Sequence, residues 1–293
     1  MNSHDDGMPE VQLSDVTIAY DVFGSPEGEA VILVCGMGQP AVAWQLGMVP
    51  ALVDAGYQVV TFDSRGVAPS SAPPAPYTID QMVDDTLGLI DHLDLARVCV
   101  IGYSMGGWIA ETLAFRHPDR VRAAVFIGSC NVGTSWEKLI TTVERDLARL
   151  DPELPKWFGA VETMRYLPNS ELQKDSTVDA WLGMIGDTEP WPNPGHLGQL
   201  EAALEWSLDV SRAQRWPQMA LPCLILAFEH DIDSPPARAR EAAAMLPNAV
   251  VVEIPGASHL GVFTHATDAG VAVVDFLGSA GRGSPGRGSA EVP

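Results

Sequence analysis

Short apolar runs alternate with segments of helical period along most of the chain. Apolar and largely β-branched residues fill the runs 30–34, 57–62, 97–101, 121–127, 223–228 and 249–254. Runs this short indicate strands buried on both faces, and the apolar–polar alternation of 11–13 and 16–23 indicates two more strands. Between them, the period of the apolar residues predicts helices over 43–55, 78–93, 105–117, 236–245 and 267–277. Strands that alternate with helices in this way predict an α/β protein with a mostly parallel, doubly wound sheet.

The alternation breaks between residues 132 and 216, where the pattern is helical with Pro, Gly and Asn interruptions. This insertion divides the predicted core into residues 9–131 and 217–277. It holds six of the eight tryptophans, namely Trp136, Trp157, Trp181, Trp191, Trp206 and Trp216. Residues 1–8 are polar, which predicts a flexible N-terminus. Residues 278–293 consist largely of Gly, Ser, Pro and Arg, which predicts a disordered tail.

Charge and cysteine usage narrow the possible partners. With 17 basic and 38 acidic residues the formal net charge is −21, which argues against nucleic acid or an anionic membrane as a partner. No apolar run is long enough to span a bilayer, and no secretory signal precedes the first strands. The cysteines show no metal-binding spacing, so we expect buried free thiols, no metal, no cofactor and a cytoplasmic location. They are Cys35, Cys99, Cys130 and Cys223.

One strand-to-helix junction carries a candidate nucleophile. Residues 98–115 read VCVIGYSMGGWIAETLAF, so Ser104 stands between Gly102 and Gly106 where an apolar run passes directly into a helix. A turn this tight needs residues without a Cβ, and it is typical of the nucleophile elbow, which presents one hydroxyl at the mouth of a sheet. The alternative is a serine in an ordinary strand–helix turn.

A serine becomes a nucleophile near neutral pH when an imidazole takes its proton and a carboxylate orients that imidazole. The carboxyl ends of parallel strands meet at one edge of the sheet, and the order Ser, Asp, His is the one this topology produces. His259 follows the last strand and is the preferred base, with His230 as its rival. Asp231 follows the strand before it and is the preferred acid. Asp233 is the alternative acid, or it caps the next helix.

The oxyanion that forms during acyl transfer is usually stabilised by backbone N–H groups. The amide of Met105 follows the serine at a helix N-terminus and is one candidate. The amide of Met37, in the turn after residues 30–34, is the other. The glycines on either side of it, Gly36 and Gly38, are equally compatible with a plain tight turn.

Five stretches together resemble the α/β-hydrolase fold superfamily, in its branch of small cytoplasmic esterases, lactonases, cofactor-free haloperoxidases and proline iminopeptidase-like enzymes. They are AVILVCGMG, VVTFDSRGVAPSS, VCVIGYSMGGWIAETLAFRHPDRV, LILAFEHDIDSPP and IPGASHLGVF, in this order. The resemblance covers residues 10–278, and it places the insertion 132–216 where that family carries a helical cap, or lid.

The resemblance implies a role for each candidate: Ser104 as nucleophile, His259 as base, Asp231 as orienting acid, and the amides of Met37 and Met105 as the oxyanion hole. The chain departs from the family at Cys35, where His is usual before the glycine. It departs again at residues 66–70, which read Gly-Val-Ala-Pro-Ser where the family often has Gly-x-Gly-x-Ser.

The tryptophan-rich insertion suggests an apolar lid over the site, although these side chains could instead pack the lid's own core. We expect Gly36, Trp108, Trp136 and Trp181 to line a pocket for a bulky, largely apolar ester, lactone or thioester. Two alternatives within enzymes use the same triad, namely cofactor-free perhydrolysis or haloperoxidation and C–C bond hydrolysis. A ligand-binding receptor on a hydrolase scaffold is the alternative outside enzymes.

Overall fold

The computed structural model describes residues 8–130, 134–150, 160–161, 164–186 and 194–280. Its strands form one sheet in the order β1-β2-β4-β3-β5-β6-β7-β8. β2 pairs antiparallel with β1 and β4, and the other neighbours pair in parallel, which confirms the predicted fold class. The strands are β1 Glu10–Gln12, β2 Thr17–Phe23, β3 Ala30–Val34, β4 Gln58–Phe62, β5 Val98–Tyr103, β6 Val121–Ile127, β7 Cys223–Phe228 and β8 Ala249–Ile254.

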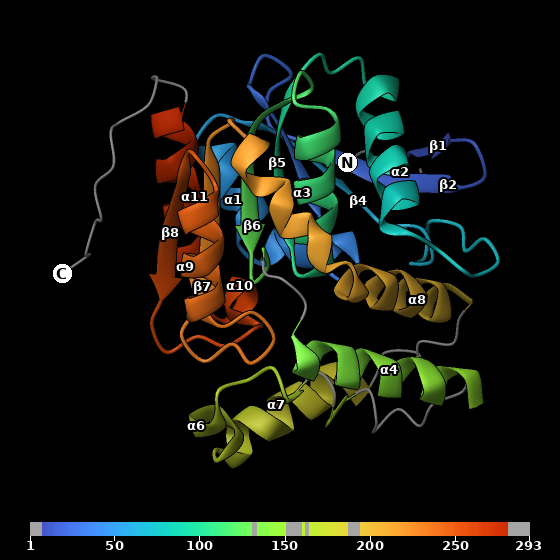
Figure 1. Ribbon diagram of the computed structural model, residues 1–293, viewed down its shortest axis with the longest axis vertical. Coiled ribbons are helices and arrows are strands. Elements are labelled where there is room, and N and C mark those ends of the chain that lie inside the picture. The colour runs from blue at the N-terminus through green and yellow to red at the C-terminus, as the bar shows by residue number, and fades with distance from the viewer. Residues whose placement is uncertain (1–7, 131–133, 151–159, 162–163, 187–193, 281–293) are drawn as a thin grey trace, which may run out of the picture.

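Each face of the sheet has its own apolar core, because successive strand side chains point to opposite faces. In β3, Ile32 joins the core beneath α2, α3 and α9, whereas Leu33 joins the core beneath α1 and α11 (Figure 1). The helices on the first face are α2 Ile79–His92, α3 Met105–Arg116 and α9 Pro236–Met245. Those on the second are α1 Met48–Asp54, the short α10 Gly261–Thr264 and α11 Ala266–Ala280.

The insertion is helical where the structure describes it. It contains α4 Ser135–Leu150, α6 Asn169–Leu172, α7 Asp175–Gly186 and α8 Pro194–Leu208, followed by 3-10 turns η2 Val210–Gln214 and η3 Trp216–Gln218. Helix α8 lies between α4 and the core, with α6 and α7 beyond α4 (Figure 1). The boundaries predicted for the cap stay predictions, and Trp157 and Trp191 lie outside the described residues.

Two predicted helices differ from those observed. The segment 43–55 divides into a 3-10 turn, η1 Ala41–Leu46, and α1, because Gly47 adopts φ −175° and ψ −50° between them. A Cβ at Gly47 would lie 2.4 Å from the Cβ of Ala266, so the break lets α11 approach closely. The last helix also runs three residues into the predicted tail, to Ala280, because Ser279 Oγ donates to the Phe276 carbonyl and Ala280 packs on the core. Residues 1–7 and 281–293 lie outside the described residues.

None of the described helices combines the length and apolar composition that crossing a membrane requires. Within the described chain, no group of three or more His, Cys, Asp or Glu side chains is arranged to hold a metal ion. All four cysteines are buried and free, as expected.

Candidate active site

The junction of β5 and α3 holds Ser104 in a strained conformation. Its φ of 53° and ψ of −122° belong to a region that residues with a side chain rarely adopt. The neighbouring glycines make the turn possible, since a Cβ at Gly102 would lie 2.0 Å from the Gly106 carbonyl oxygen. A Cβ at Gly106 would lie 2.2 Å from the carbonyl oxygen of Val34. The expectation that glycines permit a sharply turned serine is confirmed.

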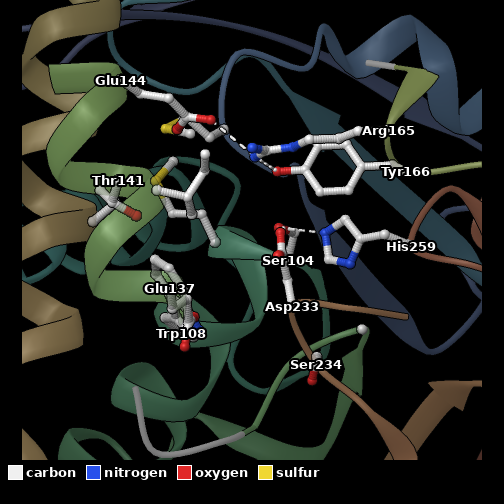
Figure 2. A pocket seen from close by; sticks show the side chains of 15 residues that line it. Ser104, Trp108, Glu137, Thr141, Glu144, Arg165, Tyr166, Asp233, Ser234 and His259 are labelled. Carbon is white, nitrogen blue, oxygen red and sulfur yellow. Dashed lines mark hydrogen bonds and ion pairs between the residues drawn. The ribbon is translucent and has the colours of Figure 1, made fainter. Parts of the chain in front are cut away.

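Ser104, His259 and Asp231 form a continuous hydrogen-bonded line. Ser104 Oγ lies 3.0 Å from His259 Nε2, and His259 Nδ1 lies 2.7 Å from Asp231 Oδ2 (Figure 2 shows the first of these contacts). His259 is 4% exposed and Asp231 3% exposed. Burial alone would lower the pKa of His259, but the charge and hydrogen bond of Asp231 outweigh it, and the pKa is raised above 6.5.

The loop after β7 holds the two candidate acids in different contacts. Asp231 Oδ1 accepts the backbone N–H groups of Asp233 and Ser234, both at 2.9 Å, so this carboxylate is held while its other oxygen contacts the imidazole. Asp233 instead accepts the indole N–H of Trp136 at 2.9 Å. The rival base, His230, has a half-exposed ring beside Glu229. Asp231 and His259 are therefore the residues brought to Ser104.

Two tyrosines flank the imidazole of His259. Their ring centroids lie 5.2 Å (Tyr103) and 4.8 Å (Tyr166) from that of the histidine. The Tyr103 hydroxyl also donates to the His259 carbonyl at 3.0 Å, which fixes the backbone of the histidine loop. Tyr166 comes from the insertion, and nothing in the sequence pattern indicated that it would reach the histidine.

The turn after β3 brings Met37 to the cavity that Ser104 lines. Met37 and Met105 both line the cavity, and among the described residues neither of their N–H groups donates to another protein group. The adjacent amides are engaged: Gly36 donates to Gln39 Oε1 at 3.1 Å, and Gly38 donates to Gln199 Oε1 at 2.8 Å. Two glutamine side chains therefore brace the turn at which the family usually has a histidine.

Cys35 precedes this turn and is completely buried. Burial raises the pKa of its thiol far above the usual value, and Asp63 raises it further. The thiolate is therefore disfavoured, as expected for a packing residue without chemistry of its own.

The cavity above Ser104 is small, and its lining is both polar and apolar. Its volume open to water-sized molecules is about 50 Å³. Apart from Ser104 and His259, the polar side chains around it are those of Glu137, Thr141, Glu144, Arg165, Tyr166, Asp233 and Ser234 (Figure 2). Apolar side chains share the wall with these polar ones, namely those of Met37, Met105, Trp108, Ile140 and Ala203, and the apolar nature of the substrate stays a prediction.

Of the four residues predicted for the pocket, Trp108 lines this cavity. Within the described chain, the other three are absent from its lining. Gly36 lies behind the turn, where a Cβ would meet the Tyr103 ring at 3.2 Å. Trp136 is 43% exposed at the surface of α4, and Trp181 is half-buried on α7.

Comparison with known proteins identifies the family to which this chain belongs. A family model described as alpha/beta hydrolase fold matches residues 29–266. The provisionally named non-heme bromoperoxidase BpoC of Mycobacterium tuberculosis is 31% identical over 268 residues, which cover 90% of this chain and 98% of that protein. Rhodomycin D methylesterase DnrP of Streptomyces peucetius is 25% identical, with coverage of 84% of this chain and 89% of that protein.

Solved structures agree with these sequence matches. The crystal structure of BpoC superimposes with a TM-score of 0.82 at 30% identity and covers 94% of this chain and 99% of its own. The enol-lactonase of Burkholderia xenovorans gives a TM-score of 0.79 at 27% identity, with coverage of 92% and 100%. The chain therefore belongs to the α/β-hydrolase fold family, and its predicted class, an α/β-hydrolase, is confirmed.

Proposed function

We propose that this protein hydrolyses a carboxylic ester, lactone or thioester through an acyl-enzyme on Ser104. The single observation that carries the proposal is the line of contacts from Ser104 Oγ through His259 to Asp231, at 3.0 and 2.7 Å. Similarity to a methylesterase and an enol-lactonase supports the same class of bond.

In this mechanism His259 Nε2 takes the hydroxyl proton of Ser104 as Oγ attacks the substrate carbonyl. The resulting oxyanion faces the N–H groups of Met37 and Met105, and the positive end of α3 adds to their effect. His259 then returns the proton to the leaving alkoxide. Water attacks the acyl-enzyme with His259 as base, which releases the acid and restores Ser104.

Asp231 has two roles in this proposal. It accepts Nδ1–H of His259, which leaves Nε2 unprotonated and directed at Ser104. It also stabilises the imidazolium that forms in each half-reaction, in agreement with the raised pKa of His259. The hydrogen bonds from Asp233 and Ser234 hold the carboxylate so that little reorganisation accompanies proton transfer.

The test is a series of acyl esters of rising chain length alongside lactones, assayed with the wild type and Ser104→Ala. We expect hydrolysis by the wild type and a loss of at least about 10⁴ in kcat for Ser104→Ala. A receptor that binds without turnover would give no product with any compound. Equal rates for the two proteins would refute the role of Ser104.

Perhydrolysis on the same triad is a second candidate, which the small cavity and the similarity to BpoC favour. Here hydrogen peroxide replaces water: its oxygen attacks the acyl carbonyl, Ser104 regains its proton, and a peracid leaves. About 50 Å³ admits a short acyl group and one peroxide. Bromide oxidation that requires a short carboxylic acid, peroxide and Ser104 would favour this reaction.

The cytoplasmic location stays a prediction, compatible with four free thiols.

A further inference from the structure

Among the charged side chains around the cavity, acidic ones outnumber basic ones. In the described chain, the charged side chains lining it other than His259 are those of Glu137, Glu144, Arg165 and Asp233. Arg165 Nη2 donates to Glu144 Oε1 at 2.8 Å, so the guanidinium is matched by a carboxylate of the same wall (Figure 2). The lining therefore carries an excess of carboxyl groups, in a protein whose formal net charge is −21.

Glu137 is one of the carboxyl groups in this excess. It lies in the first turn of α4 and is 7% exposed. Its Oε2 accepts the Thr134 N–H at 3.1 Å, and its own N–H donates to Thr134 Oγ1 at 3.0 Å, which is a capping box. Among the described residues, no lysine, arginine or histidine forms an ion pair with it. Burial without an ion pair disfavours the charged carboxylate, and a cation that entered the cavity would offset this effect.

The surroundings of Glu137 shift the pKa of its carboxyl group. The pKa of Glu137 is raised to about 7, mainly by burial and also by the charge of Asp233. The Thr134 N–H and the more distant charges of Arg212 and His259 act in the opposite direction. Glu137 therefore changes its charge near neutral pH, and a ligand cation would favour the ionised form.

We propose that Glu137 is a specificity-determining residue that receives an ammonium group of the substrate, so that the enzyme prefers amine-bearing esters to neutral or carboxylate-bearing ones of similar shape. This inference rests on the proposed function, because it places the ammonium beside an ester held at Ser104. Glu137 and Ser104 line one cavity of about 50 Å³, so the two groups of the substrate are separated by few bonds. The negative charge of the protein attracts such a substrate and repels an anionic one.

The experiment compares esters that differ in charge but are closely similar in shape. Ethyl 3-aminopropanoate is matched with ethyl butanoate, and ethyl hydrogen succinate supplies the anion. A second pair, 2-(dimethylamino)ethyl acetate and 3-methylbutyl acetate, places the cation on the alcohol side. At about pH 8 we expect kcat/KM for the ammonium ester to exceed that of its neutral partner at least about tenfold in one pair. At about pH 6 this ratio falls, because Glu137 becomes protonated.

Glu137→Gln removes the charge but keeps a side chain that completes a capping box, so α4 retains its N-terminus. We expect it to reduce the ammonium-to-neutral ratio to near one. Glu205→Gln is the matched control, because it removes one negative charge from an exposed position on α8 outside the cavity. It should leave the ratio unchanged, which separates a local contact from the overall charge.

Four results would overturn the inference: no ammonium preference in either pair, a preference that persists in Glu137→Gln, an equal loss in Glu205→Gln, or a preference for the succinate. The last would point to Arg165 as the recognition residue. These results leave ester hydrolysis standing, since the esters are turned over in each. A folded wild type that hydrolyses none of the compounds would remove the proposed function and this inference together.

Discussion

Gln199 Oε1, on helix α8 of the insertion, accepts the N–H of Gly38 at 2.8 Å across 161 positions of sequence. Its Nε2 donates to the carbonyl of Arg65 at 2.9 Å, and the side chain is completely buried. One residue of the insertion therefore supports the turn that presents the Met37 amide. The insertion helps to build the site that it covers.

Replacement of Gln199 by leucine tests this support. Gln199→Leu keeps the volume but leaves the Gly38 N–H and the Arg65 carbonyl without their partner. Because the oxyanion turn loses its brace, we expect kcat to fall about tenfold, or ~1.4 kcal/mol on the barrier, with little change in KM. The measurement is steady-state kinetics on an ester that the wild type hydrolyses. Gln173→Leu, at an exposed position of the insertion, is the control. An unchanged kcat in folded Gln199→Leu would show that the brace does not matter.

The raised pKa of His259 predicts where the acid limb of the activity profile lies. In the proposed mechanism His259 acts as a base when neutral, so kcat/KM should rise with pH through a pKa above the usual value of histidine. Asp231→Asn removes the carboxylate that raises this pKa. We expect the limb to move to lower pH and kcat to fall by about 10⁴, as in serine proteases whose triad aspartate is replaced. A full pH–rate profile of both proteins decides this. A larger loss in Asp233→Asn than in Asp231→Asn would reverse the assignment of the acid.

Cys35 is expected to act through packing alone. Cys35→Ser should keep kcat within about tenfold of the wild type. Native protein treated with iodoacetamide should remain unmodified at this residue, because the thiol is completely buried and its pKa is raised by burial. Mass mapping and activity are followed in the same samples. Abolished activity in a folded Cys35→Ser would contradict the packing role.

The fold and the line of contacts from Ser104 could be predicted because local sequence determines them. Apolar runs define the strands of a parallel sheet, and the ends of such strands bring Ser104, Asp231 and His259 to one edge whatever the loops between them. The glycines around Ser104 mark a turn that few other residues permit. Asp231 was preferred over Asp233 from its place directly after the strand, but its contact with His259 could be seen only in three dimensions, since both follow the same strand.

The polar part of the cavity wall could not be predicted, because α4 runs against the usual rule that a helix buries its apolar side chains and exposes its polar ones. Trp136, Leu139 and Val143 of α4 are 43–59% exposed, whereas Glu137 is buried against the cavity. The tryptophan content of the insertion therefore gave no indication of the carboxyl groups that α4 brings to the cavity. Tyr166 and Gln199 could not be predicted either, because their contacts depend on how the insertion folds back over the core.

The central claim is that Ser104 is the acylated nucleophile, and covalent trapping tests it most directly. Native protein is treated with a fluorophosphonate, and the modified peptide is identified by mass spectrometry. We predict a single adduct on Ser104, complete loss of ester hydrolysis in parallel with labelling, and no adduct in Ser104→Ala. Labelling that persists in folded Ser104→Ala, or full activity in protein labelled at Ser104, would contradict the account.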